Sequence, residues 1–318
     1  MNPFPSIKPS QSFDRRTILA GAGALLASSV VAHAAAPSGM AGTKLVLLGT
    51  TGAPYFIPER KMNGQAIVID GRVYVIDTGY GVVGRMTEAK LDFSEVAGIF
   101  LTHLHSDHVP DYPMLVYEIA HARGISPVAV FGPEGMRQVH AGALQVFGED
   151  FAHRPEMMRG LPPPDQRFAV TQISEDGVIF QDDSVKVTAL AVPHFTIPSY
   201  AYRFDSRDRS IVISGDTRAF EPLANLAKGA DVLVHEAIYL PGFAAPPYNM
   251  PEPMLKSATT VHTTPEQAGQ IAQEAGVKTL VLSHLIPGES TTPDEIWRAQ
   301  ATKHFSGEII VGHDLMII

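Results

Sequence analysis

A short run of histidine and aspartate side chains constrains this chain more than any other stretch of its sequence. The run spans residues 102–108, reads T-H-L-H-S-D-H, and directly follows the apolar segment 96–101. An apolar segment of this length predicts a buried strand, so the run lies where the strand ends and the chain turns. Imidazole nitrogens and carboxylate oxygens bind zinc and similar metals. Four such groups would crowd one tetrahedral ion, so they predict two neighbouring ions.

Further imidazole and carboxylate groups follow other predicted strands. His194, Asp216 and His284 each come after the C-terminal end of an apolar run. In layered α/β folds, strand ends along one edge of a sheet meet in one crevice. We therefore expect these residues and the 102–108 run to form one site for two metal ions. The alternative, a solvated histidine-rich turn with unrelated structural histidines, explains the shared strand-end positions less well.

The absence of cysteine limits what this site can be made of. The chain has 318 residues, none of them cysteine, so disulfides and thiolate ligands are excluded and His, Asp and Glu must supply the site. Hydrophobic residues make up 45% of the chain and charged residues only 18%, which favours a large folded core over extended disorder.

The N-terminus has the three-part pattern of a secretory signal. The sequence Asp14-Arg15-Arg16 precedes an apolar segment at residues 18–31, and small residues at 32–36 offer cleavage sites. The paired arginines indicate the twin-arginine route. The apolar segment is too short and too rich in Gly and Ala for a good membrane span, although an uncleaved anchor is the alternative.

These features predict the domain organisation and the cellular localisation of the chain. We expect a signal peptide at residues 1–36, a linker at 37–43 and one domain at 44–318, located in the periplasm or secreted, without stable membrane insertion. The whole chain has a net charge of −9 and residues 1–36 carry +2, which leaves −11 for residues 37–318. So acidic a surface repels polyphosphate, and we expect no nucleic-acid partner. A homodimer stays open.

Predicted strands and helices alternate through most of the chain, which favours an α/β fold with sheets covered by helices. The Asp70-Gly71 pair predicts a hairpin. The sequence TPEQ at residues 264–267 predicts the start of a helix that Gly276 ends. Residues 241–255 show no period, and we expect them to form a mobile loop or lid.

Taken in order, the motifs of the chain resemble the ribonuclease Z and arylsulfatase branch of the metallo-β-lactamase superfamily. They are LGTxGxP from residue 48, DTG from 77, HLHSDH from 103, VPHF from 192, YRF from 202, SGDT from 214, VHEA from 234, HTT from 262 and LSHL from 282. They extend over essentially all of residues 44–318. The resemblance implies a four-layer αββα sandwich and a metal-dependent hydrolase that acts on ester bonds.

The resemblance also assigns the predicted ligands to two ions. The first ion takes His103, His105 and His194, the second takes Asp107, His108 and His284, and Asp216 bridges them. Asp77, the aspartate of the DTG motif, would support the 102–108 run without binding metal itself. Zinc is the default for both ions, while manganese or iron stays open. In this family a hydroxide shared by the two ions attacks the ester.

Three residues are predicted to take part in proton transfer. Asp107 would hold the proton of the nucleophile while it binds one ion. His262 would face the reacting phosphate and serve the leaving group, with its tautomer held by Glu236. The alternative for His262 is a water-exposed residue beside a helix N-cap. His235, next to Glu236, is expected to be a buried structural histidine.

The chain departs from ribonuclease Z between the VPHF and SGDT motifs. Ribonuclease Z enzymes carry a long tRNA-binding arm there, whereas residues 194–214 have room only for two strands and a turn. We therefore expect a small phosphate or sulfate ester as substrate, as for phosphodiesterase-like and arylsulfatase-like members, and not precursor tRNA. Lactone or β-lactam hydrolysis is the alternative chemistry. An exported metal-binding protein without turnover is the alternative class.

Aromatic side chains near the motifs predict an apolar wall for the leaving group. They are Phe56, Tyr80, Phe195, Tyr239, Phe243 and Tyr248. For any one of these residues alone, ordinary packing is the alternative.

Overall fold

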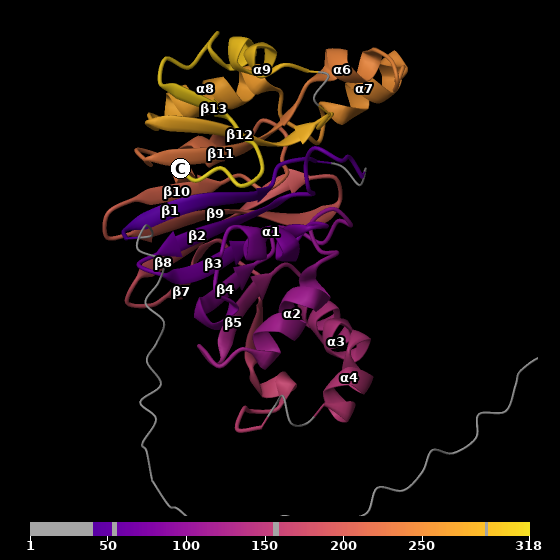
Figure 1. Ribbon diagram of the computed structural model, residues 1–318. Coiled ribbons are helices and arrows are strands. Elements are labelled where there is room, and N and C mark those ends of the chain that lie inside the picture. Colours follow the sequence, from indigo (N-terminus) through magenta and orange to yellow (C-terminus); the bar gives the residue numbers. More distant parts are fainter. Residues whose placement is uncertain (1–40, 53–55, 155–158, 290–291) are drawn as a thin grey trace, which may run out of the picture. The chain divides into compact units, whose positions relative to one another are not determined.

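The computed structural model describes residues 41–52, 56–154, 159–289 and 292–318 (Figure 1). The predicted signal peptide and residues 37–40 of the predicted linker lie outside these residues. No helix in the described ranges is long and apolar enough to cross a bilayer.

The first sheet has six strands in the order β1-β2-β3-β4-β5-β6. The strands are β1 Thr43–Gly49, β2 Gly64–Ile69, β3 Arg72–Ile76, β4 Val96–Phe100, β5 Val128–Gly132 and β6 Phe168–Gln172. Strands β1 to β3 pair antiparallel and β3 to β6 pair parallel. The predicted hairpin joins β2 to β3, and both turn residues have positive φ, 48° at Asp70 and 94° at Gly71. Two-residue hairpin turns of this kind favour such residues because their twist matches that of the strands.

The second sheet has seven strands in the order β13-β12-β11-β10-β9-β8-β7. They are β7 Gly177–Gln181, β8 Val185–His194, β9 Ile197–Ser206, β10 Ser210–Ile213, β11 Val232–Ile238, β12 Thr279–Ile286 and β13 Glu308–Val311. Strands β7 to β10 pair antiparallel, and β10 to β13 pair parallel. Between β8 and β10 the chain forms only β9 and two turns, so this part of the fold has no inserted arm.

Helices cover the outer face of each sheet (Figure 1). The helices on the first sheet are α1 Val82–Glu88, α2 Tyr112–His121, α3 Met136–Val146 and α4 Gly148–His153. Those on the second sheet are α5 Glu221–Leu226, α8 Pro265–Ala275 and α9 Asp294–Ala301. The inner faces of the two sheets meet in a core that includes Leu47, Ile67, Phe100, Tyr202 and Val234. The predicted four-layer αββα sandwich is confirmed.

Helix α8 begins and ends where the sequence predicts. The Thr264 side chain accepts a hydrogen bond from the backbone of Gln267, the Gln267 side chain bonds back to Thr264, and Gly276 ends the helix with φ 65°. Residues 241–255, by contrast, do not form the irregular loop that their sequence suggests. They hold α6 Leu240–Ala244 and most of α7 Glu252–Ala258. Each helix is too short to show a period, and each has proline in its first turn, where its missing N–H costs nothing.

Candidate metal centre

The ends of six strands place the candidate ligands and their supports at one edge of the sandwich. The metal loop, residues 102–108, leaves the end of β4, and Asp77 leaves the end of the neighbouring strand β3. The Asp77 carboxylate accepts hydrogen bonds from the backbone N–H of Thr102 at 2.8 Å and from its hydroxyl at 2.9 Å. From the other sheet come His194 at the end of β8, Asp216 just after β10, Glu236 in β11 and His284 in β12. The structure therefore brings all seven predicted ligands together.

Three imidazoles converge in one half of the centre, which we call the histidine trio: His103, His105 and His194. Nδ1 of His105 lies 3.1 Å from Nε2 of His103 and 3.2 Å from Nε2 of His194. Nδ1 of His194 donates to the carbonyl oxygen of Val261 at 3.0 Å. A carbonyl can only accept, so the Nε2 lone pair of neutral His194 faces the site. Burial lowers the pKa of His194 to about 4 and that of His103 well below its usual value, which keeps both rings neutral.

The other half, the mixed set, consists of Asp107, His108 and His284. Nε2 of His284 lies 3.2 Å from Nε2 of His108 and 3.3 Å from Oδ2 of Asp107. Nδ1 of His108 donates to the Asp77 carboxylate at 2.8 Å, so this half is held by a charged partner. Burial alone would raise the pKa of Asp107, but His108 and His284 hold it well below its usual range, and the carboxylate stays ionised.

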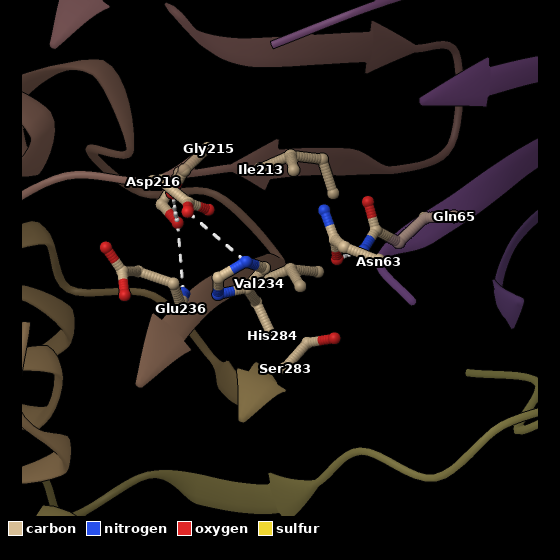
Figure 2. A pocket seen from close by; sticks show the side chains of 10 residues that line it. Asn63, Gln65, Ile213, Gly215, Asp216, Val234, Glu236, Ser283 and His284 are labelled. Atoms are coloured by element: carbon tan, nitrogen blue, oxygen red, sulfur yellow. Dashed lines mark hydrogen bonds and ion pairs between the residues drawn. The ribbon is translucent and has the colours of Figure 1, made fainter. Parts of the chain in front are cut away.

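Asp216 lies between the two halves. One of its oxygens, Oδ2, is 3.2 Å from Nε2 of His284 in the mixed set and 3.8 Å from Nε2 of His194 in the histidine trio. Its other oxygen, Oδ1, is 3.5 Å from Nε2 of His108. Figure 2 shows the Asp216 carboxylate beside the His284 ring. No other described carboxylate reaches ligands of both halves, which is the position the sequence predicts for a bridge.

The chemistry of these donors fits two cations. In the histidine trio, ring nitrogens of three histidines converge beside a carboxylate, and the Nε2 lone pair of His194 faces them, a set of donors that suits a cation. In the mixed set, three buried carboxylates surround His108. Burial lowers the pKa of His108, yet Asp216, Asp77 and Asp107 raise it well above its usual value, so these surroundings favour positive charge. The residues present therefore fit a pair of divalent ions.

His284 enters the site through a local irregularity in the sheet. Ser283 pairs with Glu236 and Leu285 pairs with Ala237, which leaves His284 as an extra residue with φ 45°. Such a bulge redirects a side chain out of the ladder. An added Cβ on Gly52 would lie 2.4 Å from the His284 ring, so the second glycine of the LGTxGxP motif makes room for the ligand.

Glu236 and His262 form a hydrogen-bonded pair beside the metal ligands. Nδ1 of His262 donates to Oε2 of Glu236 at 2.8 Å, and Oε1 of Glu236 accepts from the backbone N–H of Thr217 at 2.6 Å. Burial alone would lower the pKa of His262, but the charge of Glu236 and the hydrogen bond to it raise the pKa to about 9. His262 is therefore an imidazolium at neutral pH. His235 is fully buried, as expected of a structural histidine.

A pocket of about 300 Å³ opens over the centre. It is lined by His105, Ser106, Asp107, His194, Phe195, Asp216, His262 and His284. Metal ligands and the protonated histidine thus face the same space, where a small substrate would meet both.

The predicted aromatic wall is only partly present. Phe195 lines the pocket and is 60% exposed. Phe243 is instead buried in a small cluster with Ile238 and Ile286, so the prediction is wrong for it. The other four predicted side chains have partners away from the pocket: Phe56 packs against Tyr80, Tyr239 against Trp297, and Tyr248 bonds to Glu289. These residues lie near motifs in the sequence, but the backbone turns there direct their side chains away from the pocket.

Sequence reasoning missed Asn63 and Gln65. The Gln65 side chain donates to Oδ1 of Asn63 at 2.7 Å, and Nδ2 of Asn63 donates to Asp77 at 3.0 Å, so both residues stabilise the carboxylate that holds His108. They also line a buried cavity next to Asp216 and His284 (Figure 2). The cavity has room for about one water molecule. A signal was present, because a glutamine at the start of the otherwise apolar strand β2 is unusual.

Comparisons with known proteins identify the family of the chain. The family described as "Beta-lactamase superfamily domain" matches residues 72–285. A ribonuclease Z from Mycobacterium bovis (strain BCG / Pasteur 1173P2) is 31% identical over 278 residues, which cover 86% of this chain and 96% of that protein. A ribonuclease Z from Mycobacterium sp. (strain KMS) is 32% identical over 283 residues, 86% of this chain and 94% of that protein.

Solved structures show the same fold. The metallo-β-lactamase fold protein YhfI from Bacillus subtilis matches with a TM-score of 0.65 at 18% identity, covering 87% of this chain and 98% of that chain. The short form of human tRNase Z matches with a TM-score of 0.64 at 24% identity, covering 86% and 98%. By motifs, fold and relatives, the chain belongs to the metallo-β-lactamase superfamily, and its matches are consistent with the ribonuclease Z branch.

Proposed function

We propose that the chain is an exported hydrolase that uses two divalent ions, zinc by default, to cleave small phosphate or sulfate esters. The observation that carries this proposal is the Glu236–His262 pair, which adds a proton donor to the pocket of the metal ligands. A protein that only stores metal has no use for a protonated histidine beside its ligands. A hydrolase that expels a poor leaving group needs one.

The proposed ligands are those of the two halves with Asp216 between them. The histidine trio would hold one ion and the mixed set the other. When bound, such ions supply positive charge beside the reacting phosphorus or sulfur and acidify water.

The chain's own residues would move the protons. Asp107 is ionised and lines the pocket, so its carboxylate can accept a proton from the attacking water. Nδ1 of His262 is bonded to Glu236, which leaves Nε2 to give its proton to the ester oxygen as that oxygen leaves. Overall, water adds to the phosphorus or sulfur centre, one P–O or S–O bond breaks, and an acid and an alcohol are formed.

RNA is the second candidate substrate, and the relatives named ribonuclease Z favour it. The sequence alone suggested that the missing tRNA-binding arm argues against RNA as a substrate, but the comparison with ribonuclease Z removes this argument. The 278 aligned positions span 86% of the 318 residues, about 273, so the Mycobacterium bovis protein carries no long insertion that this chain lacks. The charge of −11 on residues 37–318 still favours a small substrate, because it repels a polyanion.

A substrate panel on zinc-loaded protein tests the proposal. We expect turnover of bis-p-nitrophenyl phosphate or p-nitrophenyl sulfate. At unchanged metal content, His262→Ala should slow the hydrolysis of an ester with an unactivated alcohol or phenol more than that of these two substrates, because p-nitrophenolate leaves readily without a proton. Turnover confined to nitrocefin or a lactone, or confined to precursor tRNA, would contradict it. No turnover of any substrate, with two ions tightly held, would favour a metal-binding protein.

Export rests on residues 1–36 and has its own test. We expect these residues, fused to a folded reporter, to carry it across the inner membrane of a bacterium with a twin-arginine pathway. The double substitution Arg15→Lys with Arg16→Lys should retain the reporter in the cytoplasm. A reporter that crosses equally well with both lysines would argue against this route.

A further inference from the structure

Phe195 is a large apolar side chain that the fold leaves open to solvent inside the pocket. Its neighbours in the pocket, His194 and Asp216, are almost completely buried, whereas Phe195 is 60% exposed. Burying a phenylalanine side chain typically stabilises a protein, so leaving one open forgoes that gain.

The backbone at Phe195 is also unfavourable. It has φ 45°, in the left-handed region that bulky residues rarely adopt, in the turn between β8 and β9. Glycine or asparagine would fit this turn with less strain. Strained residues that persist at a site often have a role there, and here the strain puts an aromatic ring where a polar turn residue would be expected.

The ring lies beside the candidate metal ligands and His262. Its centroid lies 4.8 Å from that of His194 and 5.7 Å from that of His105, both in edge-to-face contact. The His262 ring, which would protonate the leaving oxygen, is 6.4 Å away. A leaving group that receives its proton from His262 would therefore lie within reach of the Phe195 face.

We propose that Phe195 binds the leaving group, and that the preferred substrates are esters whose leaving group carries a flat aromatic or heteroaromatic ring. This inference rests on the proposed hydrolase function and adds the substrate class to it. Stacked aromatic rings attract each other beyond the area they bury. An alkyl leaving group gains less from the same contact.

Phe56 offers a matched control. It is 73% exposed and packs edge-to-face against Tyr80 with centroids 4.9 Å apart, yet it does not line the pocket. Phe56→Leu and Phe195→Leu thus remove the same exposed ring from two places. Both variants should fold, since neither side chain belongs to a core.

The experiment measures binding of phenylphosphonate and methylphosphonate to metal-loaded protein by titration calorimetry. We expect Phe195→Leu to weaken phenylphosphonate binding about tenfold, the scale of one stacked ring, and to leave methylphosphonate unchanged. For p-nitrophenyl esters KM should rise while kcat stays within about twofold, because the contact exists before and during reaction. Phe56→Leu should resemble the unaltered protein in each measurement.

Adenosine 5′-monophosphate, used as a third probe, distinguishes a nucleobase from a simple aryl ring. Binding tighter than that of phenylphosphonate, and lost in Phe195→Leu, would assign a nucleobase. Equal or weaker binding would assign an aryl group.

Two results would overturn the inference. If Phe195→Leu affects both phosphonates equally, or affects neither, while esters are still hydrolysed, then Phe195 does not select the leaving group and the proposed function stands. If the unaltered protein binds no phosphonate and hydrolyses no ester, the proposed function fails and the inference fails with it.

Discussion

The two halves of the metal centre are built on different physical principles. The histidine trio consists of rings that burial keeps neutral, and its supports are neutral too, the Thr102 hydroxyl and the Val261 carbonyl. The mixed set contains an ionised carboxylate, rests on the charge of Asp77, and includes a ligand in a strained backbone conformation at His284.

This difference predicts unequal dependence on metal. The trio brings three neutral rings together and buries no net charge. His108 of the mixed set lies among three buried carboxylates that water cannot screen, so without a cation this half carries a larger electrostatic cost. We therefore expect the mixed set to be the half that loses its order when metal is removed.

The largest expected effect comes from Asp216, which both halves share. Asp216→Ala should abolish binding of both ions and reduce hydrolysis to background, because one oxygen of this residue lies close to ligands of each half. Elemental analysis of purified protein checks this. The exposed Asp183→Ala should keep two ions. If Asp216→Ala retains both ions, then Asp216 does not bridge the two halves.

His262 should matter to neither half as a ligand. His262→Ala is expected to keep both ions and to lower kcat about 100- to 10,000-fold for an ester with an unactivated leaving group, the usual range for loss of a proton donor. Since the pKa of His262 is raised to about 9, kcat of the unaltered protein should fall as pH rises through about 9, when the imidazolium loses its proton. The variant should lack this fall. Loss of an ion would instead make His262 a ligand.

Asp77 should affect the mixed set far more than the trio. Asp77→Ala leaves His108, Asn63 and both donors of Thr102 without a buried acceptor, so we expect about 3–5 kcal/mol less stability in urea unfolding. A metal titration should show one ion weakened much more than the other, since Asp77 contacts His108 directly and the trio only through Thr102. Equal weakening of both would mean that the halves are not independent.

Gly52 should produce the smallest effect, confined to the mixed set. The Cβ of Gly52→Ala would meet the His284 ring and displace it. We expect one ion to bind about 10- to 100-fold more weakly, as for other changes behind a ligand. Gly142→Ala, where an added Cβ meets nothing within 4 Å, is the matched control. Unchanged affinity in Gly52→Ala would show that the ring can shift without loss.

Much of the fold and of the site could be predicted from the sequence because the relevant signals are local. Apolar runs predict the strands of both sheets, and histidine or aspartate after such a run predicts a group at the crevice. Strand β6 has no continuous apolar run, because it lies at a sheet edge with only its first residue fully buried, so the same signal does not predict it. Helices α6 and α7 were missed because two short turns show no period.

Features that depend on distant contacts could not be read in this way. The apolar run before His284 suggests a strand that ends there, yet β12 continues to Ile286, because Leu285 and Ile286 pair with β11 beyond the bulge. The same limit applies to Gln65, whose partner Asn63 in turn bonds to Asp77. Nothing in the order of residues tells which motif-adjacent aromatic ring enters the pocket, since backbone turns decide it.

The pairing of the Gly52 turn with β12 has a consequence for how the protein matures. The backbone N–H of Gly52 donates to the carbonyl oxygen of Leu285, and the N–H of Leu285 donates to the carbonyl oxygen of Thr50. The first turn of the domain therefore holds the residue that follows His284, the last predicted ligand in the sequence. A chain that is still being synthesised cannot form these two hydrogen bonds until residue 285 has left the ribosome. We expect both metal ions to bind only after nearly the whole polypeptide has been synthesised. Bound metal would then mark a chain whose synthesis is complete.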